Sequence, residues 1–190
     1  EQVLADLEGA SAALVFSSGI AACTAPFHAL KRGEQALVSK TIYHGVLSFI
    51  NEFAESWGIS IDYFETGHLQ DLEEKLVKGK TRLVWLETPA NPSWVVTDLE
   101  AAAKLAHEAG ALLAVDSTAA TPVLTRPLEL GADLVCHSAT KYLNGHSDVI
   151  AGFLAVREPS LEIWRRIREH RKFGGAILGS MEAYLLIRGM

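Results

Sequence analysis

The chain has 190 residues, 49% of them hydrophobic and 21% charged, an ordinary globular composition with enough length for one domain. Its formal net charge of −6 argues against a surface that neutralises nucleic acid or anionic lipid. Small-molecule chemistry stays open, and we expect neither nucleic acid nor membrane as a partner.

Cysteine usage and hydropathy predict the compartment. The two cysteines, Cys23 and Cys136, have no C-x-x-C spacing, which favours free thiols in a reducing compartment over a disulfide framework. No apolar run reaches the roughly 18 residues of a membrane span, and no stretch resembles a signal peptide. The cytoplasm is the expected location.

Apolar runs of strand length alternate along the chain with segments of helical period. The chain opens with what reads as the second half of an amphipathic helix. The predicted strands are Ala13–Ser18, Gln35–Lys40, Ile59–Phe64, Arg82–Thr88, Ala111–Thr118, Ala132–Ser138 and Ile150–Val156. The predicted helices are Gly19–Leu30, Tyr43–Trp57, Leu69–Val77, Asp98–Ala109, Leu161–His170 and Ser180–Arg188. Such alternation predicts an α/β domain with a mostly parallel sheet.

Polar residues follow several of these strands, at the sheet edge where ligands of α/β proteins bind. They are Ser17 and Ser18, then Glu87, Thr88 and Asn91, then Asp116, Ser117 and Thr118, and finally Ser138, Thr140 and Lys141. Each has an ordinary explanation alone: a turn, a helix cap or a solvated lysine. Because they share one edge, we interpret them together as a ligand site.

The combination fits an aromatic aldehyde that carries a phosphate and a ring nitrogen. The turn Ser17–Ala22 at a helix start favours an anionic group. Asp116 ends a buried strand and needs a positive or hydrogen-bonding partner. A lysine such as Lys141 can form a covalent link to an aldehyde. Pyridoxal phosphate (PLP) requires all three features.

The sequence resembles the Cys/Met-metabolism (trans-sulfuration) family of PLP-dependent enzymes, which includes cystathionine γ-synthases and lyases. The strongest stretch is VDSTAATPVLTRPLELGADLVCHSATKYLNGHSDVIAG, from Val115 to Gly152. FSSGIAA, ETPANPS and GAILGSMEAYLLIRGM support it in the expected order. The resemblance implies an aspartate-aminotransferase-like fold (PLP fold type I). Residues 1–190 would form its PLP-binding large domain, as a piece of a longer protein or its ordered part.

The resemblance also implies roles for individual residues. Lys141 would bind the cofactor covalently and then act as the base that moves substrate protons. Tyr43 would stack on the cofactor ring and take part in acid–base steps, Asn91 would bond the phenolic oxygen, and Asp116 would hold a proton on the ring nitrogen. The phosphate site is expected from Ser18, Gly19, Ile20, Ser138 and Thr140.

The reaction implied is elimination or replacement at the β or γ carbon of a sulfur-containing or O-acylated amino acid. We favour γ-replacement of the cystathionine γ-synthase kind, with cystathionine or methionine γ-lyase and O-acylhomoserine sulfhydrylase as alternatives. His44 and Gly45 follow Tyr43 where methionine γ-lyases have a cysteine, which argues against that lyase. Ser117 and Ala119 replace the family's usual Asn and Phe, predicting a wider pocket. The family pattern further implies a homodimer or homotetramer with active sites shared between subunits.

The sequence also admits three other interpretations. A zinc site of Cys136, His137 and His146 is disfavoured because successive strand residues point to opposite faces. A catalytically inactive PLP-binding regulator would have no need of Lys141, Asp116 and Tyr43 together. A class I aldolase also uses a lysine but needs no phosphate site and no aspartate at a ring nitrogen.

Overall fold

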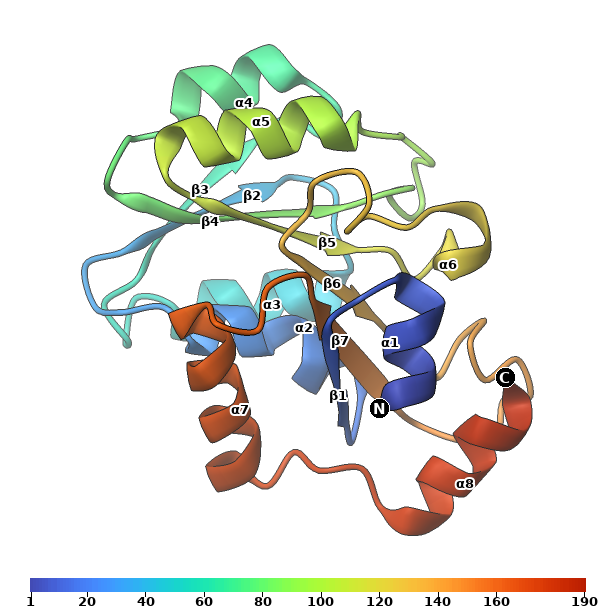
Figure 1. Cartoon of the computed structure of the whole chain (residues 1–190). Coiled ribbons are helices and arrows are strands. Elements are labelled where there is room, and N and C mark those ends of the chain that lie inside the picture. The colour runs from blue at the N-terminus through green and yellow to red at the C-terminus, as the bar shows by residue number, and fades with distance from the viewer.

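Seven strands form one sheet in the computed structural model, which describes residues 1–190 (Figure 1). Each predicted strand is confirmed: β1 Ala12–Phe16, β2 Gln35–Ser39, β3 Ser60–Phe64, β4 Thr81–Glu87, β5 Leu112–Asp116, β6 Leu134–His137 and β7 Gly152–Val156. Their order is β1-β7-β6-β5-β4-β2-β3. All neighbours are parallel except β7, which is antiparallel to both β1 and β6. The mostly parallel sheet predicted from the sequence is therefore confirmed.

Burial explains why these strands are continuously apolar. Every residue of β2, β6 and β7 is buried, as is typical of strands covered by helices on both faces. The edge strand β3 is mostly half-buried instead and carries the exposed Asp62. The sheet is thus the middle of three layers. Polar side chains are accommodated at the carboxyl ends of its strands, outside the apolar core.

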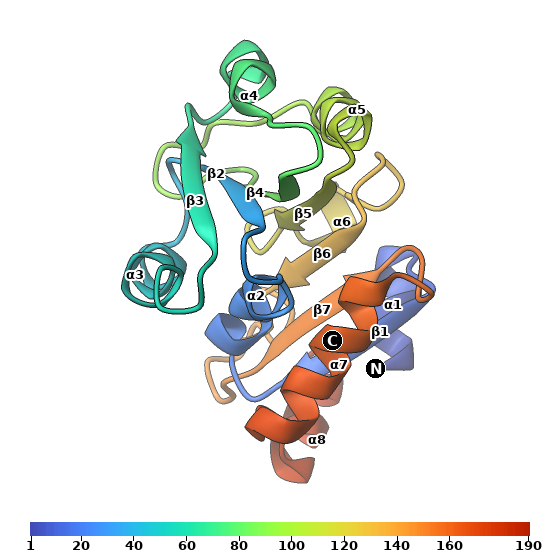
Figure 2. The ribbon, with the colours of Figure 1, turned by 90° about the vertical axis from the view of Figure 1, so that its left-hand side faces the viewer.

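Helices cover both faces of the sheet (Figure 2). One core packs α1 Gln2–Glu8, α4 Leu69–Lys75, α5 Leu99–Ala109 and α8 Ser180–Gly189 against it. The second core packs α2 Gly19–His28, α3 His44–Phe53 and α7 Glu162–Gly174. The six predicted helices are present, although α3 ends at Phe53 rather than near Trp57. One short helix, α6 Thr121–Leu124, was not predicted.

The end signals of α5 illustrate how local sequence sets an element. Asp98 accepts a hydrogen bond from the Ala101 N–H at 3.0 Å, which satisfies a donor of the first turn. Gly110 ends the helix with φ of 78°, a conformation that glycine adopts without a side-chain clash. The residues at both ends of α5 therefore set its limits locally.

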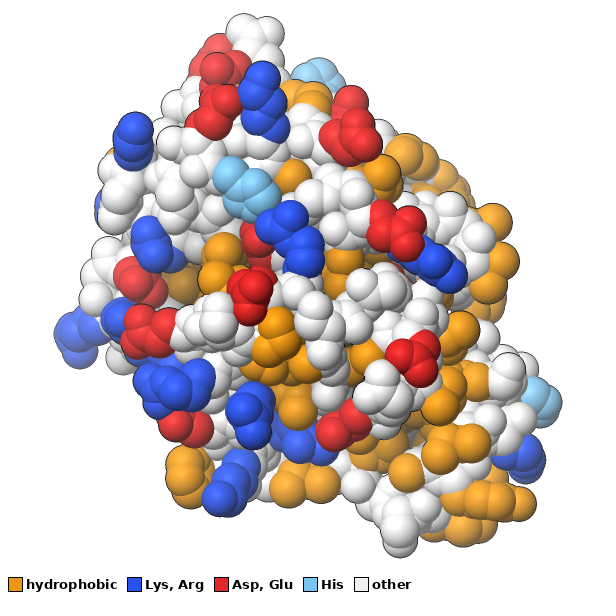
Figure 3. Space-filling model, viewed as in Figure 1, with side chains coloured by type: hydrophobic (Ala, Val, Ile, Leu, Met, Phe, Trp, Pro, Cys, Tyr) orange, Lys and Arg blue, Asp and Glu red, His pale blue; other side chains and the backbone are white.

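Apolar side chains remain exposed on α8. Met181, Tyr184 and Ile187 are 61%, 61% and 64% exposed. Figure 3 shows hydrophobic side chains gathered at the lower right of the molecule, over this helix. None of the helices combines the length and the apolar character that a membrane crossing requires.

A close backbone approach joins β7 to the turn before α2. A Cβ atom added to Gly152 would lie 2.1 Å from the Ser18 carbonyl oxygen, well inside van der Waals contact. Glycine is therefore required at the start of β7 if the Ser18 turn is to keep its place above the sheet.

We predict that Gly152→Ala lowers the free energy of unfolding by about 1–3 kcal/mol, because the turn must move to admit the methyl group. Gly174→Ala is the matched control, since its Cβ would lie 3.8 Å from the nearest atom, in the His170 ring. Urea denaturation of both variants measures the difference. Equal stability of the two would contradict the close approach.

Candidate functional site

The Asp116 carboxylate lies at the end of β5 and is 5% exposed. Its Oδ1 accepts hydrogen bonds from Thr118, at 3.0 Å from the backbone N–H and 2.6 Å from the hydroxyl. Its Oδ2 has only the Cys23 thiol, at 3.5 Å. A thiol is a weak donor, so one oxygen of this buried carboxylate lacks a strong partner.

Ser138 connects the Asp116 loop to the start of α2. The Ser138 N–H donates to the Thr118 hydroxyl at 2.8 Å. A Cβ added to Gly19 would lie 2.6 Å from Ser138 Oγ, so the α2 backbone lies directly against this serine. Ser18 is the N-cap of α2, and its hydroxyl accepts from the Ala21 N–H at 3.2 Å. Ser18, Gly19, Ile20 and Ser138 thus meet where the first N–H groups of a helix lack intrahelical partners.

Lys141 is exposed, although it follows the buried strand β6. It lies in a turn beyond the end of β6, where its N–H donates to the Ser138 carbonyl at 3.0 Å. Its side chain is exposed and forms no ion pair. The turn therefore fixes the lysine backbone beside Ser138 and leaves the amine free.

The Thr140 hydroxyl is engaged by the chain itself. It donates to the Ala151 carbonyl at 3.1 Å and accepts from the Ala151 N–H at 3.0 Å. A hydroxyl has one hydrogen to donate, so Thr140 must give up the carbonyl bond before it can donate to a ligand. The structure brings Thr140 to the expected edge but assigns its hydroxyl to the loop.

Glu87, to which the sequence analysis gave no role, joins two further segments of the site. This carboxylate ends β4 and is 6% exposed. Its Oε2 accepts from the Tyr43 N–H at 2.6 Å, and its Oε1 accepts from the Asn91 N–H at 2.9 Å. The signal that singled out Asp116, an acid directly after a buried apolar strand, applies equally to Glu87.

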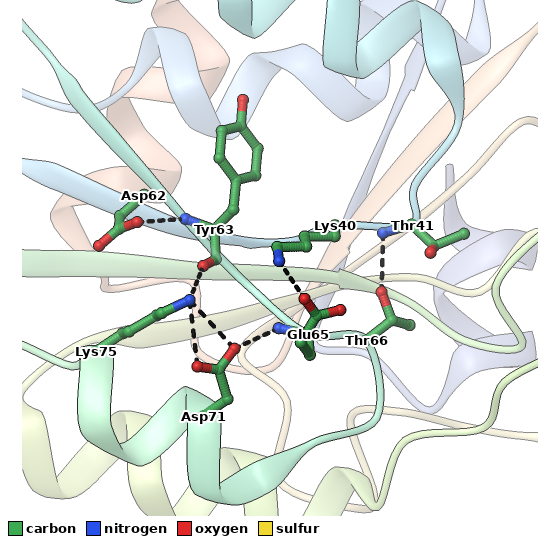
Figure 4. A network of polar contacts seen from close by, with 8 residues as sticks. All are labelled: Lys40, Thr41, Asp62, Tyr63, Glu65, Thr66, Asp71 and Lys75. Carbon is green, nitrogen blue, oxygen red and sulfur yellow. Dashed lines mark hydrogen bonds and ion pairs between the residues drawn. The ribbon is translucent and has the colours of Figure 1, made fainter.

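The residues just before Tyr43 are held by contacts with the segment that follows β3 (Figure 4). The Thr41 N–H donates to the Thr66 hydroxyl at 2.8 Å, and Lys40 forms an ion pair with Glu65. These contacts tie the loop after β2 to the loop after β3. The Tyr43 side chain is 46% exposed, so its backbone is fixed while its ring is left accessible.

The carboxylates of Glu87 and Asp116 are neighbours at the strand ends. Glu87 and Asp116 are directly paired in the register of β4 and β5. Burial, and after it the Asp116 charge, raises the pKa of Glu87 from its ordinary value of 4.5 to about 7, although the N–H bonds from Asn91 and Tyr43 oppose the rise. The site therefore contains a carboxyl group that titrates near neutral pH.

Two thiols lie beneath Asp116, with Cys23 and Cys136 sulfur atoms 2.8 Å apart and both residues buried. The hydrogen bond with Cys136 lowers the pKa of Cys23, but burial and the nearby carboxylates outweigh it and raise that pKa to about 12. His137 instead pairs with Glu8, in the other core. The expected alternation is confirmed, because Cys136 and His137 point to opposite faces of the sheet.

Comparisons with known proteins show the family of this chain. The family model described as Cys/Met metabolism PLP-dependent enzyme matches residues 1–190. Cystathionine beta-lyase MetC of Bacillus subtilis is 37% identical over 190 residues, covering 100% of this chain and 48% of that protein. An L-methionine gamma-lyase of Porphyromonas gingivalis is 41% identical over 192 residues, with coverage of 100% and 48%.

Solved structures show the same fold. The crystal structure of metB from Corynebacterium glutamicum matches with a TM-score of 0.93 and 38% identity, covering 100% of this chain and 49% of that one. Cystathionine gamma-lyase from Lactobacillus plantarum, complexed with L-serine, matches with a TM-score of 0.94 and 36% identity, covering 99% and 49%. The chain spans about half the length of the relatives it matches. It belongs to the family of Cys/Met metabolism PLP-dependent enzymes.

Proposed function

We propose that the full-length protein is a PLP-dependent enzyme that carries out β/γ-elimination or γ-replacement on a sulfur-containing or O-acylated amino acid. The observation that carries this proposal is the gathering of Asp116, Ser138 and the start of α2 at one sheet edge, with Lys141 in the adjoining turn. Family membership supports the cofactor and the reaction type.

The residues present fit pyridoxal phosphate. Asp116 Oδ2 is a buried acceptor with only a weak thiol donor, which suits a protonated ring nitrogen. Ser138 lies against Gly19 at the N-terminus of a ten-residue helix, a position that favours a phosphate group. We assign the phosphate to Ser18, Gly19, Ile20 and Ser138, with Thr140 joining only if its hydroxyl leaves the Ala151 carbonyl.

The bound cofactor would supply an electron sink for the carbanion formed at the substrate α carbon. Lys141 would hold the cofactor through its amine and, once released by substrate, move protons between substrate carbons. Its exposed, unpaired side chain supports this assignment. Tyr43 would stack on the ring and act in acid–base steps, Asn91 would bond the phenolic oxygen, and Asp116 would keep the ring nitrogen protonated.

Within the family we favour cystathionine γ-synthase chemistry. A Bacillus subtilis relative named cystathionine gamma-synthase/O-acetylhomoserine (thiol)-lyase is 39% identical and supports this choice. Methionine γ-lyase is the second candidate, since relatives with that name reach 41% identity, although His44 and Gly45 stand where that enzyme has its cysteine. Steady-state rates on O-succinylhomoserine, O-acetylhomoserine, cystathionine and methionine separate these activities.

We further propose a homo-oligomer, dimer or tetramer, located in the cytoplasm. The exposed apolar side chains of α8 support contact with another part of the full-length protein or with a second copy. The two free thiols support a reducing compartment.

We predict that Lys141→Ala in the full-length protein lowers turnover by at least about 10² to 10⁴-fold, because a general base and the covalent link are lost together. The matched control is Lys104→Ala, which removes an exposed lysine from α5, away from the strand ends. Borohydride treatment followed by peptide mass spectrometry should find the cofactor on the Lys141 peptide of the wild type and of the control. Near-normal turnover of Lys141→Ala would exclude the assigned role.

We predict that Asp116→Asn keeps the fold, because an amide oxygen still accepts the two Thr118 hydrogen bonds. Turnover should fall by about 10² to 10³-fold, since an amide cannot keep the ring nitrogen protonated as a carboxylate does. Asp62→Asn, on the exposed edge strand, is the control. Circular dichroism tests whether the fold is kept, and steady-state kinetics measure the turnover. Unchanged turnover would show that the ring nitrogen has another partner.

A further inference from the structure

The Glu87 carboxylate joins the loop that carries Tyr43 to the loop that carries Asn91, and we call these two loops the rims of the site. Tyr43 follows β2 and Asn91 follows β4, and both side chains are exposed. Glu87 accepts the backbone N–H of each, at 2.6 Å and 2.9 Å, one on each carboxylate oxygen. An ionised carboxylate accepts on both oxygens, whereas a protonated one carries a hydrogen that opposes one of the two donors. The charge state of Glu87 therefore decides whether both rims are held.

The surroundings of Glu87 contain like charge and no cation. Asp116 lies beside it on β5, the buried thiols of Cys23 on α2 and Cys136 on β6 lie nearby, and Tyr43 contacts it through its backbone N–H. No ion pair of the structure includes Glu87 or Asp116. Without a cation nearby, burial and the Asp116 charge raise the pKa of Glu87 to about 7. A positive group arriving at Asp116 would relieve that repulsion.

We propose that Glu87 is a positioning residue that gives up a proton to solvent when the cofactor ring binds at Asp116, and so tightens its hold on Tyr43 and Asn91. This inference rests on the proposed function, because it requires a protonated ring nitrogen beside Asp116. By linkage, a site that releases a proton on binding binds more tightly as pH rises. Glu87 thus couples cofactor affinity to pH on the acidic side of about 7.

The direction of the effect follows from the raised pKa. In the cofactor-free protein Glu87 is largely protonated below about 7, whereas its ordinary value is 4.5. Its contribution to stability is complete below pH 4.5 and is lost as pH rises through about 7. Bound cofactor moves the pKa back down, so proton release and rising affinity fall in the window between about 4.5 and 7.

The test is calorimetric titration of pyridoxal 5'-phosphate into cofactor-free full-length protein between pH 5.5 and 8, in buffers of different ionisation enthalpy. Wild type is compared with Glu87→Gln and with the control Glu108→Gln, an exposed glutamate of α5. Near pH 6, wild type and control should release up to about one proton more than Glu87→Gln. Their affinity should rise with pH by up to roughly tenfold per unit more than that of the variant, and the excess should vanish above neutral pH.

Two further measurements separate charge from positioning. Glu87→Asp keeps an ionisable group but shortens its reach, so it should retain proton release and still bind the cofactor less tightly than wild type. Denaturant unfolding of the cofactor-free proteins should show that stability falls with pH between 4.5 and 7 in wild type and less steeply in Glu87→Gln. If Glu87→Gln does not fold, Glu87→Asp and the wild-type proton count carry the test.

The outcomes distinguish this inference from the proposed function. If the cofactor binds wild type and Glu87→Gln with the same proton release and pH dependence, the Glu87 inference is overturned and the proposed function stands. If no variant and no wild-type protein binds the cofactor at any pH, the proposed function fails together with the coupling. The unfolding curves then still decide whether Glu87 takes up a proton on folding, and equal slopes would contradict it.

Discussion

The site is organised around a buried carboxylate, Asp116, at the end of the parallel strand β5. Asp116 is only 5% exposed at the end of β5, and no cation pairs with it. Burying such a group is costly unless hydrogen bonds compensate, and Thr118 supplies two of them to a single oxygen. The other oxygen is left with a thiol, which makes it available to a positively charged ligand group. Ser138 and the start of α2 are then positioned through the same Thr118 hydroxyl and the close approach at Gly19.

The second carboxylate follows from the same register. Because β4 and β5 are parallel neighbours, their last residues, Glu87 and Asp116, are paired at one edge. Glu87 satisfies its oxygens with backbone donors from Tyr43 and Asn91 rather than with a lysine or arginine. Burial and the Asp116 charge raise the pKa of Glu87, and the same two backbone donors oppose that rise.

Most of the fold and the location of the site could be predicted from sequence. Strands such as β6 and β7 are buried on both faces, so their apolar runs stand out, and the parallel strands bring Asp116 and Ser138 to one edge. Other features could not be predicted. The antiparallel direction of β7 leaves no mark on its composition, and Thr140 bonds Ala151 through a loop closure that spacing does not encode. Glu87 contacts Tyr43 and Asn91 through their backbone N–H groups. Because nearly every residue has such a group, the sequence does not mark these contacts.

We propose that this strand edge binds pyridoxal phosphate, with Lys141 as its covalent partner. The most direct measurement is a crystal structure of the full-length protein with the cofactor. We predict continuous density from the Lys141 side chain to the cofactor, with the ring nitrogen at Asp116 Oδ2 and the phosphate between Ser138 and the start of α2. A cofactor bound elsewhere, or held here without a bond to Lys141, would contradict it.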